Sequence, residues 1–149
     1  MTTTVPIVAP CRFKEAREAA GLEVEVLARD LEITPESVWD LEMCEGEWRT
    51  CLSPVQLLRF CRTTATPVIE LFGAPEGGSP LTPVDLARSI QDYCGREGLS
   101  LGGFGERVGW EVDGLHDDPS GMLQKIPMDG LIAIADQVGV DWRRVLFGL

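Results

Sequence analysis

The sequence has little basic charge for its length. Its 149 residues include 13 lysines and arginines against 24 aspartates and glutamates, and the formal net charge is −11. Most non-specific affinity for duplex DNA comes from basic side chains that displace counterions from the phosphates. Residues 1–75 carry 7 basic and 12 acidic side chains, and residues 76–149 carry 6 and 12, so neither half conceals a basic domain. We therefore expect DNA binding to be weak or absent.

Long apolar runs are also missing. No stretch approaches the roughly 20 apolar residues that a membrane-spanning helix needs, and residues 1–10 lack the basic start of a secretory signal. A composition of 44% hydrophobic and 25% charged residues is typical of a globular protein. The sequence thus predicts no membrane span and a cytoplasmic location.

Cysteine is present, but not in a pattern that builds a site. The five cysteines are odd in number and form no Cys-x-x-Cys pair, which argues against a disulfide framework and against a zinc knuckle. We expect most of them to be small buried apolar residues. A redox pair of Cys44 and Cys51 is the alternative.

Catalytic residue patterns are scarce. His116 is the only histidine, and the chain has no glycine-rich phosphate loop and no metal-ligand spacing of histidine and cysteine. Asp113, His116, Asp117 and Asp118 could together hold a metal, but a solvated acidic turn explains them more simply. We predict a non-enzymatic protein with no cofactor and no metal site.

The first half reads as five short helices. Apolar residues at helical spacing and start signals at Thr34-Pro35, Ser53-Pro54 and Thr66-Pro67 mark them, and Met43 to Cys51 reads as irregular. The helix after Thr34 should bury Val38 and Leu41.

The pattern then repeats after a segment rich in proline and glycine. Gly98-Leu99 follows Gly21-Leu22 by 77 residues, and Leu146-Phe147-Gly148 follows Leu71-Phe72-Gly73 by 75. Thr82-Pro83 starts the second set of helices, and Asp141 can cap its last one. We predict an all-α protein made of two tandem five-helix domains, residues 11–73 and 82–149, joined by a linker at 74–81.

Residues 13–73 resemble the phage-repressor type of helix-turn-helix domain, the Xre/Cro family. The resemblance lies in Leu-Ala-Arg-Asp-Leu of the second helix, Thr-Pro-Glu-Ser-Val leading into the third, and the final Leu-Phe-Gly. The second domain matches only by its apolar spacing and its Leu-Phe-Gly, as a degenerate copy. The resemblance implies an ion pair between Arg17 and Glu42. The shift of 77 puts Cys94 and Pro119 at the corresponding positions, so both partners are absent together.

The resemblance also indicates which positions would read DNA. In the family these are the start of helix two and the outward face of helix three, which here carry Glu23, Val24, Glu36, Ser37, Trp39 and Asp40. Met43 extends the same outward face. Three of these residues are carboxylates and none is basic, so the surface should repel phosphates. The corresponding stretch of the second half, 111–119, is more acidic and contains a glycine and a proline, which disfavours a regular helix.

Two tryptophans have open interpretations. Trp39 either anchors a protein partner, as tryptophans often do at binding hot spots, or leans on the neighbouring domain. Trp48 is expected to pack beneath the 43–51 segment.

Two functional hypotheses follow. The first is a protein-binding regulator or inhibitor, of the antitoxin, immunity, phage-inhibitor or DNA-mimic type, whose partner has a basic surface and whose acidic face comprises Glu23, Glu36, Ser37, Trp39, Asp40 and Met43. The second is an Xre-family DNA-binding transcription regulator. A homodimer is compatible with both.

Overall fold

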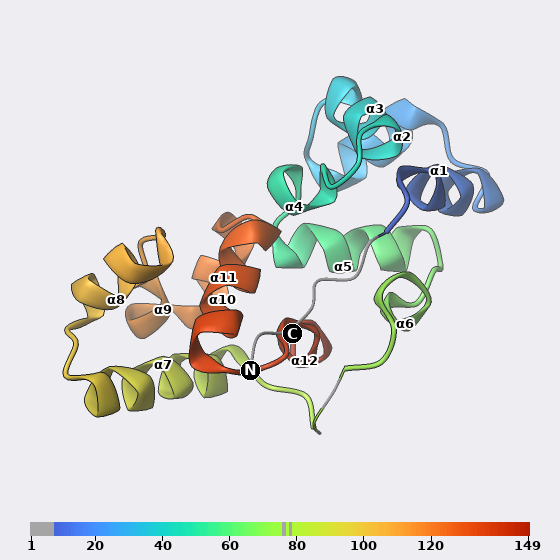
Figure 1. Cartoon of the computed structure of the whole chain (residues 1–149). Helices are drawn as coiled ribbons and strands as arrows, with labels where there is room; N and C mark the ends of the chain where they lie inside the picture. Colours follow the sequence, from blue (N-terminus) through green and yellow to red (C-terminus); the bar gives the residue numbers. More distant parts are fainter. Residues whose placement is uncertain (1–7, 76, 78) are drawn as a thin grey trace.

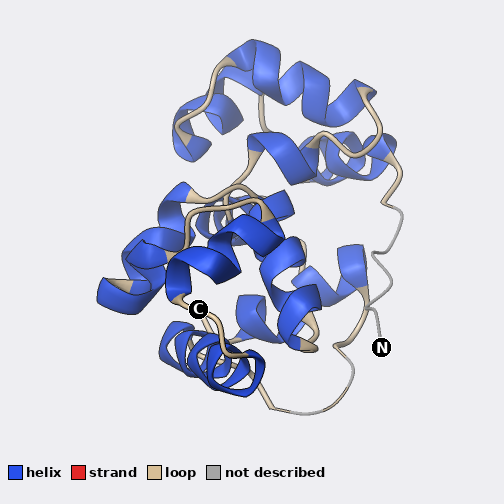
Figure 2. Ribbon diagram, turned by 60° about the vertical axis from the view of Figure 1, so that its left-hand side comes forward, coloured by secondary structure: helices blue, strands red, loops and turns tan. Residues whose placement is uncertain are grey.

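The computed structural model describes residues 8–75, 77 and 79–149. Throughout these residues the regular structure is helical, without strands, so the all-α prediction is confirmed (Figure 2). No helix in this part of the chain combines the length and apolar character needed to cross a membrane.

Twelve helices are formed within the described ranges. They are α1 (Pro10–Ala19), α2 (Val24–Leu31), α3 (Pro35–Met43), α4 (Trp48–Cys51), α5 (Pro54–Thr63), α6 (Val68–Phe72), α7 (Pro83–Glu97), α8 (Leu101–Val108), α9 (Asp113–Asp117), α10 (Pro119–Lys125), α11 (Met128–Val138) and α12 (Trp142–Phe147). Figure 1 shows α1–α3 at one end of the molecule, α7–α9 at the other, and α5, α10, α11 and α12 between them.

Side-chain caps set several helix starts where the sequence predicted them. Thr34 accepts a hydrogen bond from the backbone N–H of Ser37 at 3.1 Å. Ser53 and Thr82 each form a capping box with the third residue of their helix, and Asp141 accepts from the N–H of Arg143 at 3.0 Å. These bonds satisfy amide groups that a helix leaves unpaired in its first turn.

Two short helices lie where the sequence analysis expected none. α4 lies within the segment 43–51, which was expected to be irregular, so that expectation is wrong for its last four residues. In the second half α9 ends at Asp117. Asp118, whose φ of −145° and ψ of 78° are not helical, follows it, and Pro119 begins α10. Proline lacks an N–H and suits a first turn, so the chain starts a new helix there.

Each half contains an edge-to-face pair of buried aromatic rings, at positions that do not correspond to each other. In the first, Phe13 and Phe60 pack edge to face with ring centroids 5.3 Å apart. In the second, Tyr93 and Phe104 do so at 5.5 Å. The Tyr93 hydroxyl accepts hydrogen bonds from Arg107 Nη1 (2.9 Å) and Gln137 Nε2 (2.6 Å), which links α7 to α8 and α11.

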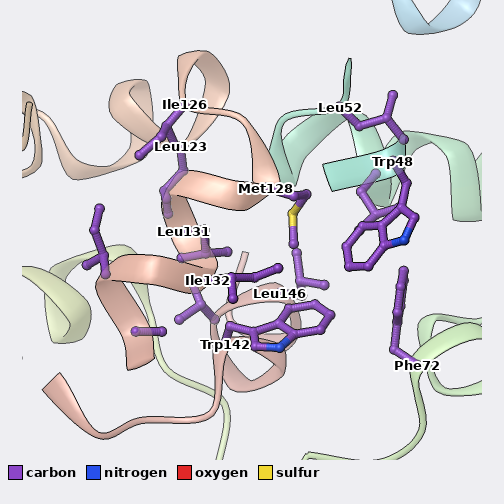
Figure 3. Close-up of a cluster of buried hydrophobic side chains, with 14 of the residues drawn as sticks. Trp48, Leu52, Phe72, Leu123, Ile126, Met128, Leu131, Ile132, Trp142 and Leu146 are labelled. Carbon is purple, nitrogen blue, oxygen red and sulfur yellow. The ribbon is translucent and has the colours of Figure 1, made fainter. Parts of the chain in front are cut away.

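An aromatic cluster joins the halves. Trp48 of α4, Phe72 of α6 and Trp142 of α12 pack with ring centroids 4.9 to 5.9 Å apart, and all three are buried (Figure 3). Trp48 therefore lies between the two halves, whereas the sequence analysis expected it beneath its own segment. Such large rings bury 150–250 Å² each, and their burial holds the halves together.

Polar contacts fix the same junction. The N–H of Met128 donates to the carbonyl of Leu52 at 2.8 Å, Arg49 Nε donates to Asp129 Oδ1 at 2.7 Å, and Arg143 Nη1 donates to the carbonyl of Phe72 at 2.8 Å. Leu81, the last residue of the predicted linker, is also attached, since its N–H donates to the carbonyl of Arg144 at 2.9 Å. The halves pack together, and their relative position is set by these bonds.

Candidate functional site

The candidate site is the outward face of α3. Thr34 and Pro35 start the helix, and Val38 and Leu41 are fully buried, as their spacing predicted. A helix turns about 100° per residue, so burying these two positions directs the intervening ones to solvent. The face thus exposed is Glu36, Trp39, Asp40 and Met43, which we call the acidic-aromatic face.

Its apolar members are unusually accessible. Trp39 is 55% exposed and Met43 65%, and they lie four residues apart, on adjacent turns of one helical face. Exposed carboxylates of Glu36 and Asp40 stand beside Trp39. More than half of the Trp39 side chain is exposed, so it is not buried against the other half.

Ser37 and Glu23 contribute differently from the rest. Ser37 is only partly exposed, and its hydroxyl lies 3.0 Å from that of Thr34, so it takes part in the cap of the helix. Glu23 is exposed at the N-cap position of α2 and makes no side-chain cap bond. The structure therefore brings four of the six predicted residues onto one face and places Glu23 on another helix.

A bidentate ion pair holds α3 in place behind this face. Arg17 Nε and Nη2 donate to Glu42 Oε2 and Oε1 at 2.7 and 3.0 Å, and Arg17 Nη1 donates to the carbonyl of Leu22 at 2.8 Å. The hydrogen bonding to Glu42 raises the pKa of Arg17, against the opposing effect of burial. The pair connects α1, α3 and the turn before α2, and so fixes the orientation of the face.

The start of α3 is poorly suited to phosphate. A helix N-terminus attracts anions through its free amide groups, but here the N–H of Ser37 is already bonded to Thr34, and Glu36 places a carboxylate in the first turn. Both features disfavour a phosphate at this position.

The second half lacks an equivalent face. α9 has five residues, and the ring Nδ1 of His116 lies 2.8 Å from Gln91 Nε2. Cys94 is buried and its Sγ lies 3.9 Å from the carbonyl oxygen of Ser100, while Pro119 starts α10. The structure forms no ion pair between these two positions.

The five cysteines are all free thiols. Cys11 and Cys44 are exposed, Cys51 is partly buried, and Cys61 and Cys94 are buried. The expectation that most are buried is therefore only partly met. Burial raises the pKa of Cys51 to about 12 and that of Cys61 to about 11. Within the ranges that the structure describes, no three His, Cys, Asp or Glu side chains are grouped to hold a metal ion.

The sequence analysis missed a groove where α5 faces α12 and residues 148 and 149. Two adjoining pockets, of about 340 and 430 Å³, share Leu58, Arg62 and Leu149. Arg59 lines one of them and Phe147 the other, and we call this surface the basic groove. The spacing of Leu58 and Arg62, four residues apart on α5, places them on one side of that helix. The sequence could not show the groove itself, because α12, which completes it, is distant in the chain.

Comparison with known proteins adds no relative. No family model matches this chain, and neither a curated protein nor a solved structure matches it.

Proposed function

We propose that the protein is a non-enzymatic, protein-binding regulator or inhibitor that uses the acidic-aromatic face of α3. The observation that carries the proposal is the exposed pair Trp39 and Met43 next to Glu36 and Asp40. Tryptophan is enriched at binding hot spots, and the carboxylates favour a partner that brings basic groups around an apolar pocket. The antitoxin, immunity, phage-inhibitor and DNA-mimic classes share this mode of action.

We further propose that the scaffold is a tandem of two helix-turn-helix-like units of the Xre type. In support, α2 and α8 have eight residues each and start 77 residues apart. The same shift relates the turn bond from Ile33 N–H to the Ala28 carbonyl (3.0 Å) to that from Trp110 N–H to the Gly105 carbonyl (3.1 Å). In the described residues, α1–α6 and α7–α12 would give each unit six helices rather than the five expected, with α4 and α10 as the additions.

Electrostatics favour a protein partner over DNA. Three carboxylates occupy the positions that would read DNA, and a net charge of −11 opposes approach to phosphates. A basic protein surface would instead be attracted by the three carboxylates and by the negative net charge.

A transcription regulator is the second candidate. The Arg17–Glu42 pair that the Xre resemblance implies is present with bidentate geometry, and it joins α1 to α3. That observation favours the family scaffold, whose usual ligand is an operator, but it says nothing of what the face binds.

The test is capture of partners from the native host. Tagged wild-type protein and the Trp39→Ala variant are cross-linked, purified and compared by quantitative mass spectrometry. A true partner is enriched by wild type and lost with Trp39→Ala. Val84→Ala is the matched control, because Val84 is an exposed apolar residue (56%) on α7, away from the face.

A charge-reversed pair refines the test. Glu36→Lys with Asp40→Lys should lower capture, whereas Asp92→Lys with Glu106→Lys, an equal change at exposed positions of the second half, should not. A protein set captured equally by every variant would overturn the proposal, and specific enrichment of one DNA sequence would favour the second candidate.

A further inference from the structure

The basic groove carries arginines beside apolar residues, whereas the acidic-aromatic face carries carboxylates beside them. Phe147 and Leu149 are each 41% exposed at its edge, and Leu58 of α5 forms part of its floor. Arg62 is exposed and makes no hydrogen bond or ion pair with any residue that the structure describes. The groove therefore joins accessible apolar walls to an available guanidinium.

Arg59 adds a second positive charge to the groove. Its Nη1 donates to the carbonyl of Asp30 at 3.2 Å and lies 3.9 Å from Glu32 Oε2, a distance at which an exposed ion pair contributes little. Arg59 and Arg62 lie three apart on α5 and so project from the same side of the helix. The groove is therefore locally positive, although the chain as a whole has a net charge of −11.

The two surfaces are complementary in charge, and each has an apolar part. Glu36 and Asp40 would meet the two arginines, and Trp39 with Met43 would enter the apolar part of the groove. The larger pocket, about 430 Å³, is within the range of 300–1,000 Å³ that admits ligands larger than an indole ring. Arginine also stacks on tryptophan, which would add to the contact.

One molecule cannot make this contact with itself. α3 lies on the upper side of α5 in Figure 1, whereas α12 lies below it. The Arg17–Glu42 pair and the buried residues of α3 hold the face in that position. The complementary surfaces can meet only between two molecules.

We propose that the α3 face of one copy docks in the basic groove of a second copy, in a head-to-tail contact. The inference rests on the proposed function in that it uses the same α3 face, and it names a second copy of this chain as one occupant. Self-docking would cover the face until a tighter partner displaces it. Because the two surfaces differ, the contact is heterologous and can extend beyond a dimer.

The experiment is analytical ultracentrifugation of the untagged full chain over a wide concentration range. We expect the average mass to rise with concentration and to fall between about 0.1 and about 1 M salt, where the Debye length shortens from about 10 to about 3 Å. Trp39→Ala should lower the association constant by about 30-fold, the equivalent of the hot-spot threshold. Arg62→Glu should lower it as well, while Val84→Ala and Arg96→Glu on α7 should not.

Mixing the two defective variants tests the pairing directly. Trp39→Ala keeps an intact groove and Arg62→Glu an intact face, so an equimolar mixture should form dimers and nothing larger, at concentrations where each variant alone is mostly monomeric. Circular dichroism confirms that both are folded. A wild-type chain that remains monomeric, or association that neither variant weakens, or a mixture without dimers, would overturn head-to-tail docking.

The outcome separates this inference from the proposed function. Arg62→Glu leaves the α3 face intact, so it should still capture an external partner from the host, and more efficiently if self-docking competes. If a partner is captured but the chain does not self-associate, head-to-tail docking is overturned and the proposed function stands. If the chain self-associates through Trp39 but captures no partner, the proposed function is overturned and head-to-tail docking stands.

Discussion

Arg17 and Glu42 form a bidentate ion pair that is almost fully shielded from water, with side-chain exposures of 12% and 2%. Burying two charges is costly, and the pair compensates only while both partners remain. Its position behind the exposed face of α3 links the stability of the first half to the orientation of the candidate site.

Removing one partner should destabilise the protein strongly. Arg17→Ala leaves the Glu42 carboxylate buried without its guanidinium, and we expect a loss of about 3 kcal/mol or more in the free energy of unfolding, measured by urea denaturation. Replacing both residues, by Arg17→Met with Glu42→Leu, should cost less than either single change. Cys94→Ala, at the corresponding position of the second half, is the control, and an equal loss there would contradict the assignment.

Trp39→Ala should leave the fold intact. The side chain is 55% exposed, so its removal creates no cavity, and surface changes of this kind usually alter stability by less than about 0.5 kcal/mol. Circular dichroism and thermal unfolding measure this. Once a partner is identified, the same variant should cost about 2 kcal/mol or more of binding free energy, and a variant that unfolds would show that Trp39 is structural.

Trp142→Ala should weaken the junction between the halves. Trp142 is 1% exposed and packs against Trp48 and Phe72, and truncating a buried tryptophan typically costs 3–5 kcal/mol. Phe147→Ala, on the same helix but 41% exposed, should cost much less. If urea unfolding showed equal losses, the aromatic cluster would not be holding the halves together.

Alkaline pH should destabilise the protein through its buried thiols. Burial raises the pKa of Cys51 from 9.0 to about 12 and that of Cys61 to about 11, so between about pH 9 and these values the unfolded chain loses protons that the folded chain keeps. The contribution of these two thiols to stability is therefore complete below about pH 9 and is lost as pH rises towards their folded pKa values. Urea midpoints of wild type and of Cys51→Ala measured from pH 8 to 10.5 check this, and the variant should show the shallower decline.

Thiol labelling gives an independent readout of the same burial. With a chromogenic disulfide at neutral pH, Cys11 and Cys44 should react first because they are exposed, while Cys61 and Cys94 should react only on unfolding. Fast labelling of all five thiols in the folded protein would contradict the described packing.

Binding to duplex DNA should be weak or absent. A fluorescence anisotropy titration against random and upstream DNA at about 150 mM salt should show no affinity tighter than the non-specific range of 10⁻⁴ to 10⁻⁶ M. Glu36→Lys with Asp40→Lys should increase the affinity, because it replaces two carboxylates facing the phosphates by two cations. Sub-micromolar binding by wild type would contradict the prediction.

The parts of the structure that could be predicted depend on local chemistry. Thr34, Ser53 and Thr82 cap helices through bonds to residues three positions ahead, and Val38 with Leu41 shows the buried face of α3 through spacing alone. Capping and helical periodicity depend on residues only a few positions apart, so they can be predicted from the sequence. The exposure of Trp39 follows from that same spacing.

Contacts between distant residues were decided only in three dimensions. Trp48 and Trp142 meet across the junction although 94 positions separate them, and the basic groove forms only when the end of α12 lies beside α5. The sequence shows that the residues of the junction and the groove are apolar or basic. It does not show which of them come into contact, because that depends on how the two halves pack together. The sequence by itself thus determined the capped helix starts and the outward face of α3, whereas the tertiary structure decided the short helices α4 and α9, the junction and the groove.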